Sequence, residues 1–411
     1  MRQIRGDTHM ADAKETAREE KEAERSKARH LRKCRRIARF KPVQKNKIVF
    51  SQFGGKGYGC NPRAICDEFL KRGDAYDLVW ILGKSQNRKD SRIPDRVRVV
   101  KDREAVYELL TAKVWINNIH FNKMYENGLV KRDKTIYLNT FHGGITLKSE
   151  GTDKNTYKEK AYEELSEKEK NYRTDADYVD YITCGGEVEK HVLEEFFYGK
   201  GEILELGDAR TDILINGSPE AEQAIRATYQ IPAGTKIAFF APTFRNGMVL
   251  KWYNMDYVRV VESLEEMTGD PWVLLIRLHP RLISKAKKLI PKHEKIINAS
   301  KYPDMQDIAV AADLMISDYS SAITDFMLTR KPAFMYVPDL EEYQEKRGMY
   351  YTMEQLPFPY AKTTDDLIAV MRQFDAEQYQ KDIDKFLELI GYHADGQAAK
   401  RIVDFLISKM E

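Results

Sequence analysis

Residues 313–339 read DLMISDYSSAITDFMLTRKPAFMYVPD, and this stretch predicts a buried strand, a turn, a helix and a second strand in close succession. Its first apolar run, Leu314–Ile316, is followed directly by residue types that cap helices. Apolar residues then recur at helical spacing until Lys331-Pro332, where we expect the helix to end before a strand over 333–337. A strand, a helix and a strand joined so closely indicate a parallel sheet.

The turn between the first strand and the helix carries groups that suit a phosphate. Backbone N–H groups of a first helical turn attract an anion, and serine hydroxyls add further donors. The residues that we expect at this site are Ser317, Asp318, Ser320 and Ser321. Most serine-rich turns only cap a helix, so the assignment depends on what the neighbouring strand ends carry.

The composition indicates a globular α/β protein of two domains. The chain has 411 residues, whereas single cores stop growing at roughly 250–300 residues. Hydrophobic residues make up 42% of it, and strand and helix patterns alternate along most of its length. We expect a basic segment at 1–43, a first Rossmann-like domain at 44–215, and a second at 216–411 that ends in closing helices.

Several kinds of site are disfavoured by what the sequence lacks. The four cysteines form no Cys-x-x-Cys pair, so we expect neither a zinc site nor disulfides, and a reducing cytosol is the simplest compartment. No apolar run approaches the roughly 18 residues that a spanning helix needs. The glycine-rich run at 54–59 lacks GxGxxG placement, so a dinucleotide cofactor is not expected.

The segment at 21–41 holds ten Lys or Arg residues against two Glu and is predicted to form a basic helix with a thin apolar stripe. The stripe consists of Leu31, Cys34, Ile37, Ala38 and Phe40. One interpretation is a solvated tail ahead of a folded part that begins after Pro42. The other is docking on an anionic membrane surface, which attracts each basic residue by about 1 kcal/mol. Nucleic acid is not the expected partner, because the segment lacks interleaved aromatic residues.

In the first domain, a predicted strand over 136–141 runs into His142-Gly143-Gly144. Ligands of open α/β sheets bind beyond the carboxyl ends of strands, and glycines clear space around the histidine. We therefore expect His142 to be functional.

In the second domain, Arg245 follows a strand over 236–240 and His279 follows a strand over 273–278. These two residues and the serine-rich turn all lie at strand ends of one predicted sheet. Three converging groups of this kind fit a pyrophosphate.

Taken together, the motifs resemble those of the CDP-glycerol glycerophosphotransferase family, which builds teichoic acids. The matching pieces are FHGGITLKS, LGDARTDIL, FAPTFR, RLHP, DLMISDYSSAITDF, KPAFMYVPDLEEY and KRGMYY, within residues 47–405. The family more often has His-Gly-Thr where this chain has His142-Gly143-Gly144, and Gly-x-Pro-Arg-x-Asp where it has 207–212. The first difference bears on acceptor fit, and the second on the geometry of that turn.

The resemblance implies a GT-B fold, in which two Rossmann-like domains face each other across a cleft. It implies that the C-terminal domain binds CDP-glycerol, while a polyprenyl-diphosphate-linked acceptor reaches the N-terminal domain. It also implies a peripheral protein on the inner face of the cell membrane, and this favours membrane docking by residues 21–41. Neither a metal nor a cofactor is expected.

The implied reaction is attack by an acceptor hydroxyl on the β-phosphorus of CDP-glycerol, with release of CMP. We expect His142 to act as general base, and His279 to neutralise the pyrophosphate together with Arg245. Ser320 and Ser321 would hold the phosphate that stays on CMP. The remaining expected contacts are Glu342 and Tyr343 with the glyceryl end, and Gly143, Gly144 and Lys148 on the acceptor side.

Several alternatives stay open at this point. A nucleotide-sugar glycosyltransferase would use the same fold and release CDP instead of CMP, and a basic-tailed membrane scaffold would need no chemistry at all. The sequence leaves open glycerol versus ribitol phosphate, primase versus polymerase, teichoic acid versus capsule, and the oligomeric state.

Overall fold

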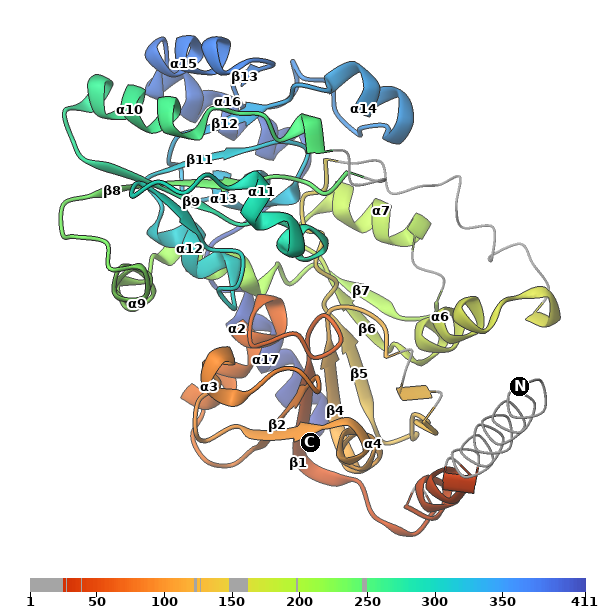
Figure 1. Ribbon diagram of the computed structural model, residues 1–411. Coiled ribbons are helices and arrows are strands. Elements are labelled where there is room, and N and C mark those ends of the chain that lie inside the picture. Colours follow the sequence, from red (N-terminus) through yellow and green to blue (C-terminus); the bar gives the residue numbers. More distant parts are fainter. Residues whose placement is uncertain are drawn as a thin grey trace, which may run out of the picture.

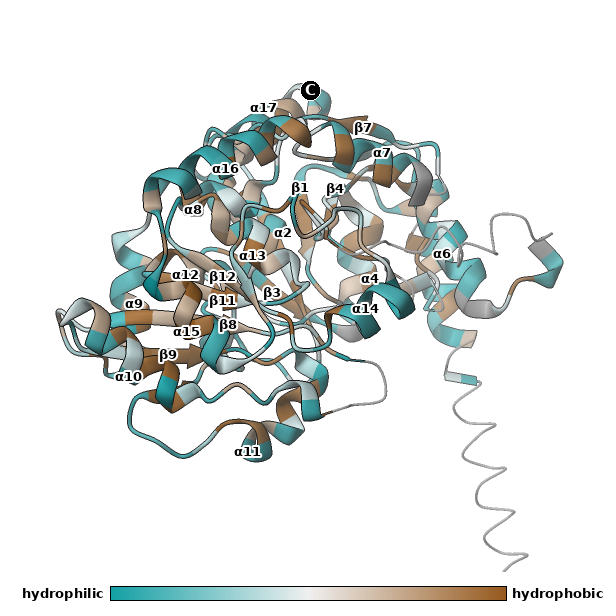
Figure 2. Ribbon diagram, turned by 90° about the horizontal axis from the view of Figure 1, so that it is seen from above, coloured by the Kyte–Doolittle hydropathy of each residue, from teal (hydrophilic) through white to brown (hydrophobic). Residues whose placement is uncertain are grey.

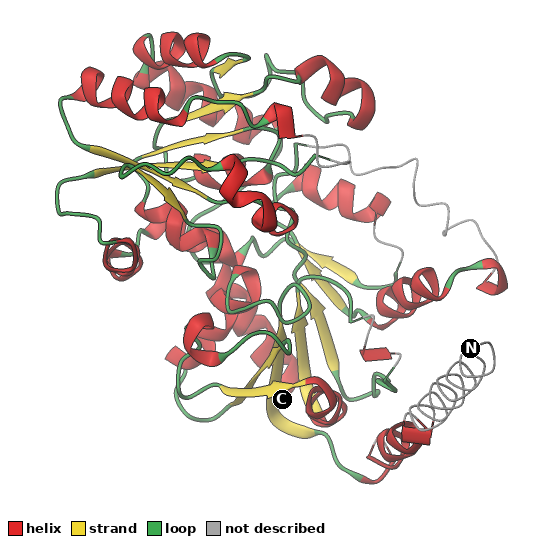
Figure 3. Cartoon of the chain, in the orientation of Figure 1, coloured by secondary structure: helices red, strands yellow, loops and turns green. Residues whose placement is uncertain are grey.

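Two parallel sheets make up the computed structural model of this chain, and helices flank each of them (Figure 1, Figure 3). The structure describes residues 25–26, 28–37, 39–121, 124–125, 127–147, 162–196, 199–245 and 250–411. The named strands of each sheet pair in parallel register. The predicted architecture of two doubly wound α/β domains is confirmed.

The first sheet has seven strands in the order β3-β2-β1-β4-β5-β6-β7. Their bounds are β1 Gln44–Ser51, β2 Asp77–Leu82, β3 Arg98–Lys101, β4 Ala112–Asn117, β5 Ile136–Asn139, β6 Tyr181–Thr183 and β7 Glu202–Leu204. The chain winds outward from β1 to one edge and then returns to place β4 on the other side of β1. Ligands of such sheets bind where the strand order reverses, beyond the carboxyl ends of the two central strands. In this sheet those strands are β1 and β4.

The second sheet has six strands in the order β10-β9-β8-β11-β12-β13, so its order reverses between β8 and β11. The bounds are β8 Lys236–Ala241, β9 Trp272–Ile276, β10 Ile296–Asn298, β11 Leu314–Ser317, β12 Ala333–Tyr336 and β13 Tyr360–Ala361. The stretch at 313–339 thus supplies β11, one helix and β12, as predicted.

Helices connect these strands along both faces of the sheets (Figure 1). The helices are α2 Cys60–Lys71, α3 Arg88–Ser91, α4 Asp102–Thr111, α6 Glu167–Tyr178, α7 Glu187–Phe196, α8 Asp212–Asn216, α9 Pro219–Tyr229, α10 Tyr257–Thr268, α11 Ala286–Leu289, α12 Met305–Ala311, α13 Ser321–Met327, α14 Leu340–Arg347, α15 Thr364–Arg372, α16 Ala376–Leu389 and α17 Ala398–Met410. Short 3-10 turns lie at Tyr162–Glu164, Ala209–Thr211, Leu250–Trp252 and Pro280–Lys285. Helix α13 ends earlier than expected, because turns occupy residues 328–330 before Lys331.

The last helix, α17, returns to the first domain. Its buried residues Ile402, Val403 and Leu406 belong to the same apolar cluster as Phe50 and Trp80 of the first sheet. Figure 2 shows hydrophilic and hydrophobic residues along α17, as expected of a helix with one face against a core. The chain therefore crosses between the domains a second time, after α16.

The basic segment also joins the first domain. Residues 28–37 are helical, and Cys34 and Ile37 are buried in the apolar cluster that contains Leu129. The Cys34 thiol donates to the Asn127 carbonyl at 3.6 Å. The expectation that the folded part begins only after Pro42 was therefore wrong, because Cys34 and Ile37 of this helix pack on the protein, although Phe40 of the same stripe is 68% exposed. None of the described helices is long and apolar enough to cross a membrane.

Candidate active site

The switch point of the second sheet holds a buried network around Arg245. This residue follows β8, and its Nε and Nη2 donate to the two oxygens of Asp339 at 2.7 and 2.9 Å. Its Nη1 donates to Asp318 and to the Thr243 carbonyl, both at 2.8 Å. Burial alone lowers the pKa of this guanidinium, but the adjacent Asp318 and Asp339 carboxylates raise it overall.

This geometry differs from the expected role of Arg245 as a direct pyrophosphate ligand. The side chain is 7% exposed, and protein oxygens already accept from its three nitrogens. Asp318, expected beside the donor, accepts from the Thr243 backbone N–H at 2.8 Å and from its hydroxyl at 2.6 Å. The network therefore holds the ends of β8 and β11 in place.

The serine-rich turn divides into a buried and a half-buried part. Ser317 is fully buried and donates its hydroxyl to the Ala241 carbonyl at 2.7 Å, so this side chain does not fit the expected contact with a donor. Ser320 caps α13 by accepting from Ala322 N–H at 3.3 Å, and Ser321 starts the helix. Both are half-buried, so they are the members of this turn that a donor phosphate can reach.

Tyr343 of α14 and Tyr319 of the turn after β11 add a buried aromatic pair to the same network. The rings of Tyr319 and Tyr343 stack at 3.7 Å, and the Arg245 guanidinium lies 5.0 and 5.2 Å from their centroids. Burial raises the pKa of both phenols. Glu342 instead lies on the outer side of the helix, paired with Lys346 at 2.7 Å. Tyr343 thus packs inside the protein, whereas Glu342 is on the surface. The two residues expected at the glyceryl end therefore do not lie on the same side of α14.

His279 lies after β9 and is exposed at the start of a 3-10 turn. Its Nδ1 accepts from the Arg281 backbone N–H at 3.3 Å, so in the neutral ring Nε2 carries the hydrogen. Phe244, beside Arg245 in the chain, packs against this ring at 5.4 Å. The neutral His279 ring therefore carries a donor nitrogen, and the ring lies beside Phe244, which follows β8.

His142 lies after β5 in the first domain and has the opposite tautomer. Its Nδ1 donates to the Asn118 carbonyl at 2.9 Å, because a carbonyl oxygen only accepts. In the neutral ring Nε2 is then the accepting nitrogen. Phe53, at the end of β1, meets the ring edge to face at 5.1 Å. The exposed His142 ring is thus fixed in orientation by the ends of two neighbouring strands.

The two glycines after His142 serve the packing of the loop. A Cβ on Gly144 would lie 2.3 Å from Arg210 Nη2, and the residue has φ +50°, so only glycine fits there without strain. A Cβ on Gly143 would meet the Phe141 ring at 2.6 Å. Lys148, the third residue expected on the acceptor side, lies outside the described residues.

Arg210 ties this loop to the second domain. It is 4% exposed, and its Nε and Nη2 donate to Asp325 of α13 at 2.9 and 3.0 Å. The Thr324 hydroxyl of the same helix donates to the Ile145 carbonyl at 2.7 Å. The loop that carries His142 is thus fastened to the helix that Ser320 caps.

The turn at 207–212 and the start of α2 complete this interface, and sequence reasoning missed their role. Asp208 accepts from the Tyr392 hydroxyl at 3.0 Å, and Asp212 accepts from the first N–H groups of α17 at 3.0 and 2.7 Å. Asn61, in the first turn of α2, donates to the Thr140 carbonyl at 3.1 Å and accepts from Arg210 N–H at 2.8 Å. The sequence signal that could have revealed this role is the alternation of charges in the Asp-x-Arg-x-Asp motif at 208–212.

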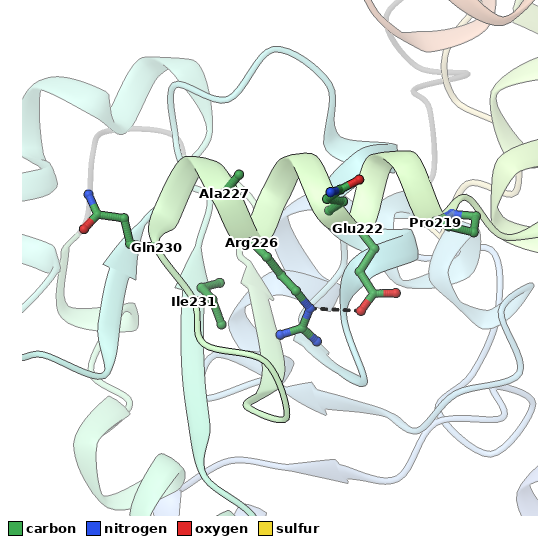
Figure 4. Close-up of a pocket in the computed structure, with 7 residues that line it drawn as sticks. Pro219, Glu222, Arg226, Ala227, Gln230 and Ile231 are labelled. Carbon is green, nitrogen blue, oxygen red and sulfur yellow. Dashed lines mark hydrogen bonds and ion pairs between the residues drawn. The ribbon is translucent and has the colours of Figure 1, made fainter.

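Two further features bear on where chemistry can occur. A surface depression along α9 is lined by Pro219, Glu222, Gln223, Arg226, Ala227, Gln230 and Ile231 (Figure 4). None of the site residues that the sequence predicted lines it, and Arg226 there donates to Glu222 at 2.9 Å. Among the described residues, no group of three or more His, Cys, Asp or Glu side chains is placed to hold a metal ion.

The Arg245 network leads to a test by Arg245→Lys. Lysine keeps the charge but cannot donate to both oxygens of Asp339, so we expect the free energy of unfolding to fall by about 1.5–3 kcal/mol. Denaturant unfolding measures this change, with Arg259→Lys at the exposed pair with Asp365 as the matched control. Weaker CDP-glycerol binding with unchanged stability would instead restore Arg245 as a direct donor ligand.

Comparison with known proteins places these features in a family. The family model of CDP-Glycerol:Poly(glycerophosphate) glycerophosphotransferase matches residues 34–408. The chain is 26% identical to the teichoic acid poly(glycerol phosphate) polymerase of Bacillus subtilis over 381 residues, 88% of this chain and 49% of that protein. It is 28% identical to the polymerase of that name from Bacillus spizizenii over 390 residues, 90% of this chain and 94% of that protein.

This chain thus spans about half the length of the first relative and nearly all of the second. A solved structure of the wall teichoic acid polymerase TagF matches with a TM-score of 0.77 and 26% identity. The match covers 94% of this chain and 95% of that one.

Proposed function

This chain belongs to the family of CDP-glycerol:poly(glycerophosphate) glycerophosphotransferases, and we propose that it moves glycerol phosphate from CDP-glycerol to a hydroxyl of a lipid-linked acceptor. The acceptor hydroxyl attacks the β-phosphorus, the bond between the two phosphates breaks, and CMP leaves. The acceptor is a teichoic acid or capsule-type chain on a polyprenyl diphosphate.

The opposite tautomers of two histidines carry this proposal. His142 in the first domain is exposed and has Nε2 as the accepting nitrogen of its neutral ring, which suits removal of a proton from the attacking hydroxyl. His279 in the second domain holds a hydrogen on Nε2, which suits donation to a pyrophosphate oxygen as negative charge shifts toward the leaving CMP. Positioning of the two substrates supplies most of the remaining rate gain.

Donor contacts are proposed for the groups at the second switch point that a ligand can reach. Ser320 and Ser321 hold the phosphate that remains on CMP, since both lie at the start of α13 and are half-buried. Arg245 does not contact the donor in this proposal. It holds the turn after β11 in place through its ion pairs with Asp318 and Asp339. The contacts Thr324–Ile145 and Arg210–Asp325 then bring the His142 loop to the same helix.

Ribitol phosphate is the second candidate for the transferred group, because a teichoic acid poly(ribitol-phosphate) polymerase is 25% identical to this chain over 389 residues. The test is incubation of the protein with CDP-glycerol, CDP-ribitol and a CDP-sugar, each with an undecaprenyl-diphosphate-linked acceptor. We expect CMP release with CDP-glycerol as the preferred donor. Preference for CDP-ribitol would change the donor, and release of CDP from the CDP-sugar would change the reaction class.

Membrane association through the basic helix is also part of the proposal. Cys34 and Ile37 of its stripe are buried against the protein, whereas Phe40 is 68% exposed. Arg29, Arg32 and Arg36 are exposed as well. Electrostatic attraction of the exposed arginines to anionic lipid is therefore the proposed means of docking, with Cys34 and Ile37 unavailable for insertion. A truncation at Pro42 would remove Cys34 and Ile37 from a core cluster, so charge reversal is the cleaner test.

The triple variant Arg29→Glu, Arg32→Glu, Arg36→Glu is expected to bind anionic vesicles at least about a hundredfold more weakly, since three attractions of about 1 kcal/mol each are lost. Vesicle cosedimentation at two salt concentrations measures the affinity. The matched control reverses Lys381, Lys385 and Lys400, which are exposed on α16 and α17 and give the same change in net charge. Equal vesicle binding by both triple variants would show that the basic helix does not dock on lipid and is only a solvated surface.

A further inference from the structure

A second histidine lies at the switch point of the first sheet and has no place in the reaction described so far. His120 follows β4, one of the two central strands at which the strand order reverses. Ligands bind beyond the carboxyl ends of such strands. The segment that carries it also fixes the general base, because the Asn118 carbonyl accepts from His142 Nδ1 at 2.9 Å.

A buried carboxylate sets the orientation of His120. Its Nδ1 lies 2.9 Å from Asp175 of α6, whose side chain is 0% exposed, while the imidazole is 28% exposed. A carboxylate accepts, so Nδ1 carries a hydrogen and in the neutral ring Nε2 is the accepting nitrogen. The ring also packs against Tyr172 at 4.6 Å. Both the position and the tautomer of the ring are thereby fixed.

Packing alone does not require a histidine here. Asp175 also accepts from Phe121 N–H at 3.0 Å and from the hydroxyls of Tyr125 and Tyr137 at 2.5 and 3.2 Å. The buried carboxylate is therefore supplied with donors besides the imidazole. What the histidine adds is a partly exposed ring of fixed tautomer, beside the strand end that anchors His142.

We propose that His120 contacts the acceptor, with Nε2 accepting a hydrogen bond from a second hydroxyl next to the one that attacks. This assignment rests on the proposed function, because it takes His142 as the group that faces the attacking hydroxyl. Both rings donate through Nδ1 to the protein and so offer the same kind of nitrogen to a ligand. Two such nitrogens on neighbouring strand ends fit a chain terminus with two adjacent hydroxyls, such as a terminal glycerol phosphate.

Acceptor binding tests the proposal without any need for turnover. The probes are a short glycerol phosphate oligomer and its counterpart whose terminal unit is propane-1,3-diol phosphate, which lacks the adjacent hydroxyl. Calorimetry gives the dissociation constant of each probe for the wild type, His120→Ala and the control His191→Ala on the surface of α7. We expect wild type and control to prefer the glycerol terminus by about three- to tenfold, the value of one neutral hydrogen bond, and His120→Ala to lose this preference.

The outcomes distinguish failure of the His120 contact from failure of the proposed function. Equal dissociation constants for both probes in the wild type, or an unchanged preference in His120→Ala, would overturn the assignment of His120. His120→Asn, which keeps a short polar side chain, checks that the loss does not come from misfolding, and a thermal unfolding midpoint near that of the wild type is expected. A wild type that prefers the glycerol terminus but never turns over CDP-glycerol would contradict the proposed function and leave the acceptor contact standing.

Discussion

Replacing His142 by alanine is expected to lower kcat for CMP release from CDP-glycerol at least about a hundredfold, because the proton of the attacking hydroxyl loses its acceptor. The ring is exposed at the end of β5, so its removal leaves no cavity in the core. The affinity for CDP-glycerol is expected to stay near that of the wild type, since the proposed donor contacts lie in the other domain. Steady-state kinetics and calorimetry measure the two quantities.

Surface variant His191→Ala serves as the control, because that histidine lies on α7 with a side chain that is 72% exposed. A His142→Ala enzyme that turns over like the wild type would remove this residue from the reaction. A normal kcat with much weaker CDP-glycerol binding would instead place the ring at the donor.

The second large effect is expected for Arg210→Met. The substitution keeps most of the volume but leaves Asp325 buried without its cation at the contact between the domains. Removal of one partner of a buried ion pair costs about 3–5 kcal/mol. Thermal unfolding followed by fluorescence should therefore show a lower midpoint, and activity should fall as well because the His142 loop loses its tie to α13.

The double variant Arg210→Met, Asp325→Leu distinguishes charge burial from positioning. An apolar pair of similar size removes the uncompensated charge of Asp325, while Asp208, 3.6 Å from Arg210 Nη1 in the wild type, stays buried. Part of the stability should therefore return while activity stays low. Arg372→Met, at an exposed pair with Glu266, is the control and should change stability by no more than about 1 kcal/mol. If Arg210→Met unfolds at the same midpoint as the control, the interface is held by other contacts.

Local sequence patterns predicted the strands and helices that surround the second switch point. Residues 314–316 form part of β11, and the apolar residues at helical spacing after them form α13. Both were predictable because hydrophobic periodicity and capping residues are local features of the sequence. The strand-end positions of His142, Arg245 and His279 were predicted for the same reason. The order of the strands then brought the β8 and β11 ends together.

Partners across the chain could not be predicted in this way. Arg245 is basic and lies at a strand end, but two carboxylates that follow β11 and β12 take up its donors. The stripe of the basic helix is visible in the sequence, yet only the fold shows that Cys34 and Ile37 of it are buried in the cluster that contains Leu129. Asn61 has the residue type of a cap, and its bonds to 140 and 210 depend on tertiary contacts.

The most direct measurement of the central claim follows the β-phosphorus of the donor. CDP-glycerol labelled with phosphorus-32 at the β-position is incubated with the protein and a lipid-linked acceptor, and the lipid and nucleotide fractions are counted. Attack on the β-phosphorus predicts that the label enters the acceptor in equal amount with glycerol, while unlabelled CMP is released. Label that remains in the nucleotide fraction as CDP would contradict transfer of glycerol phosphate.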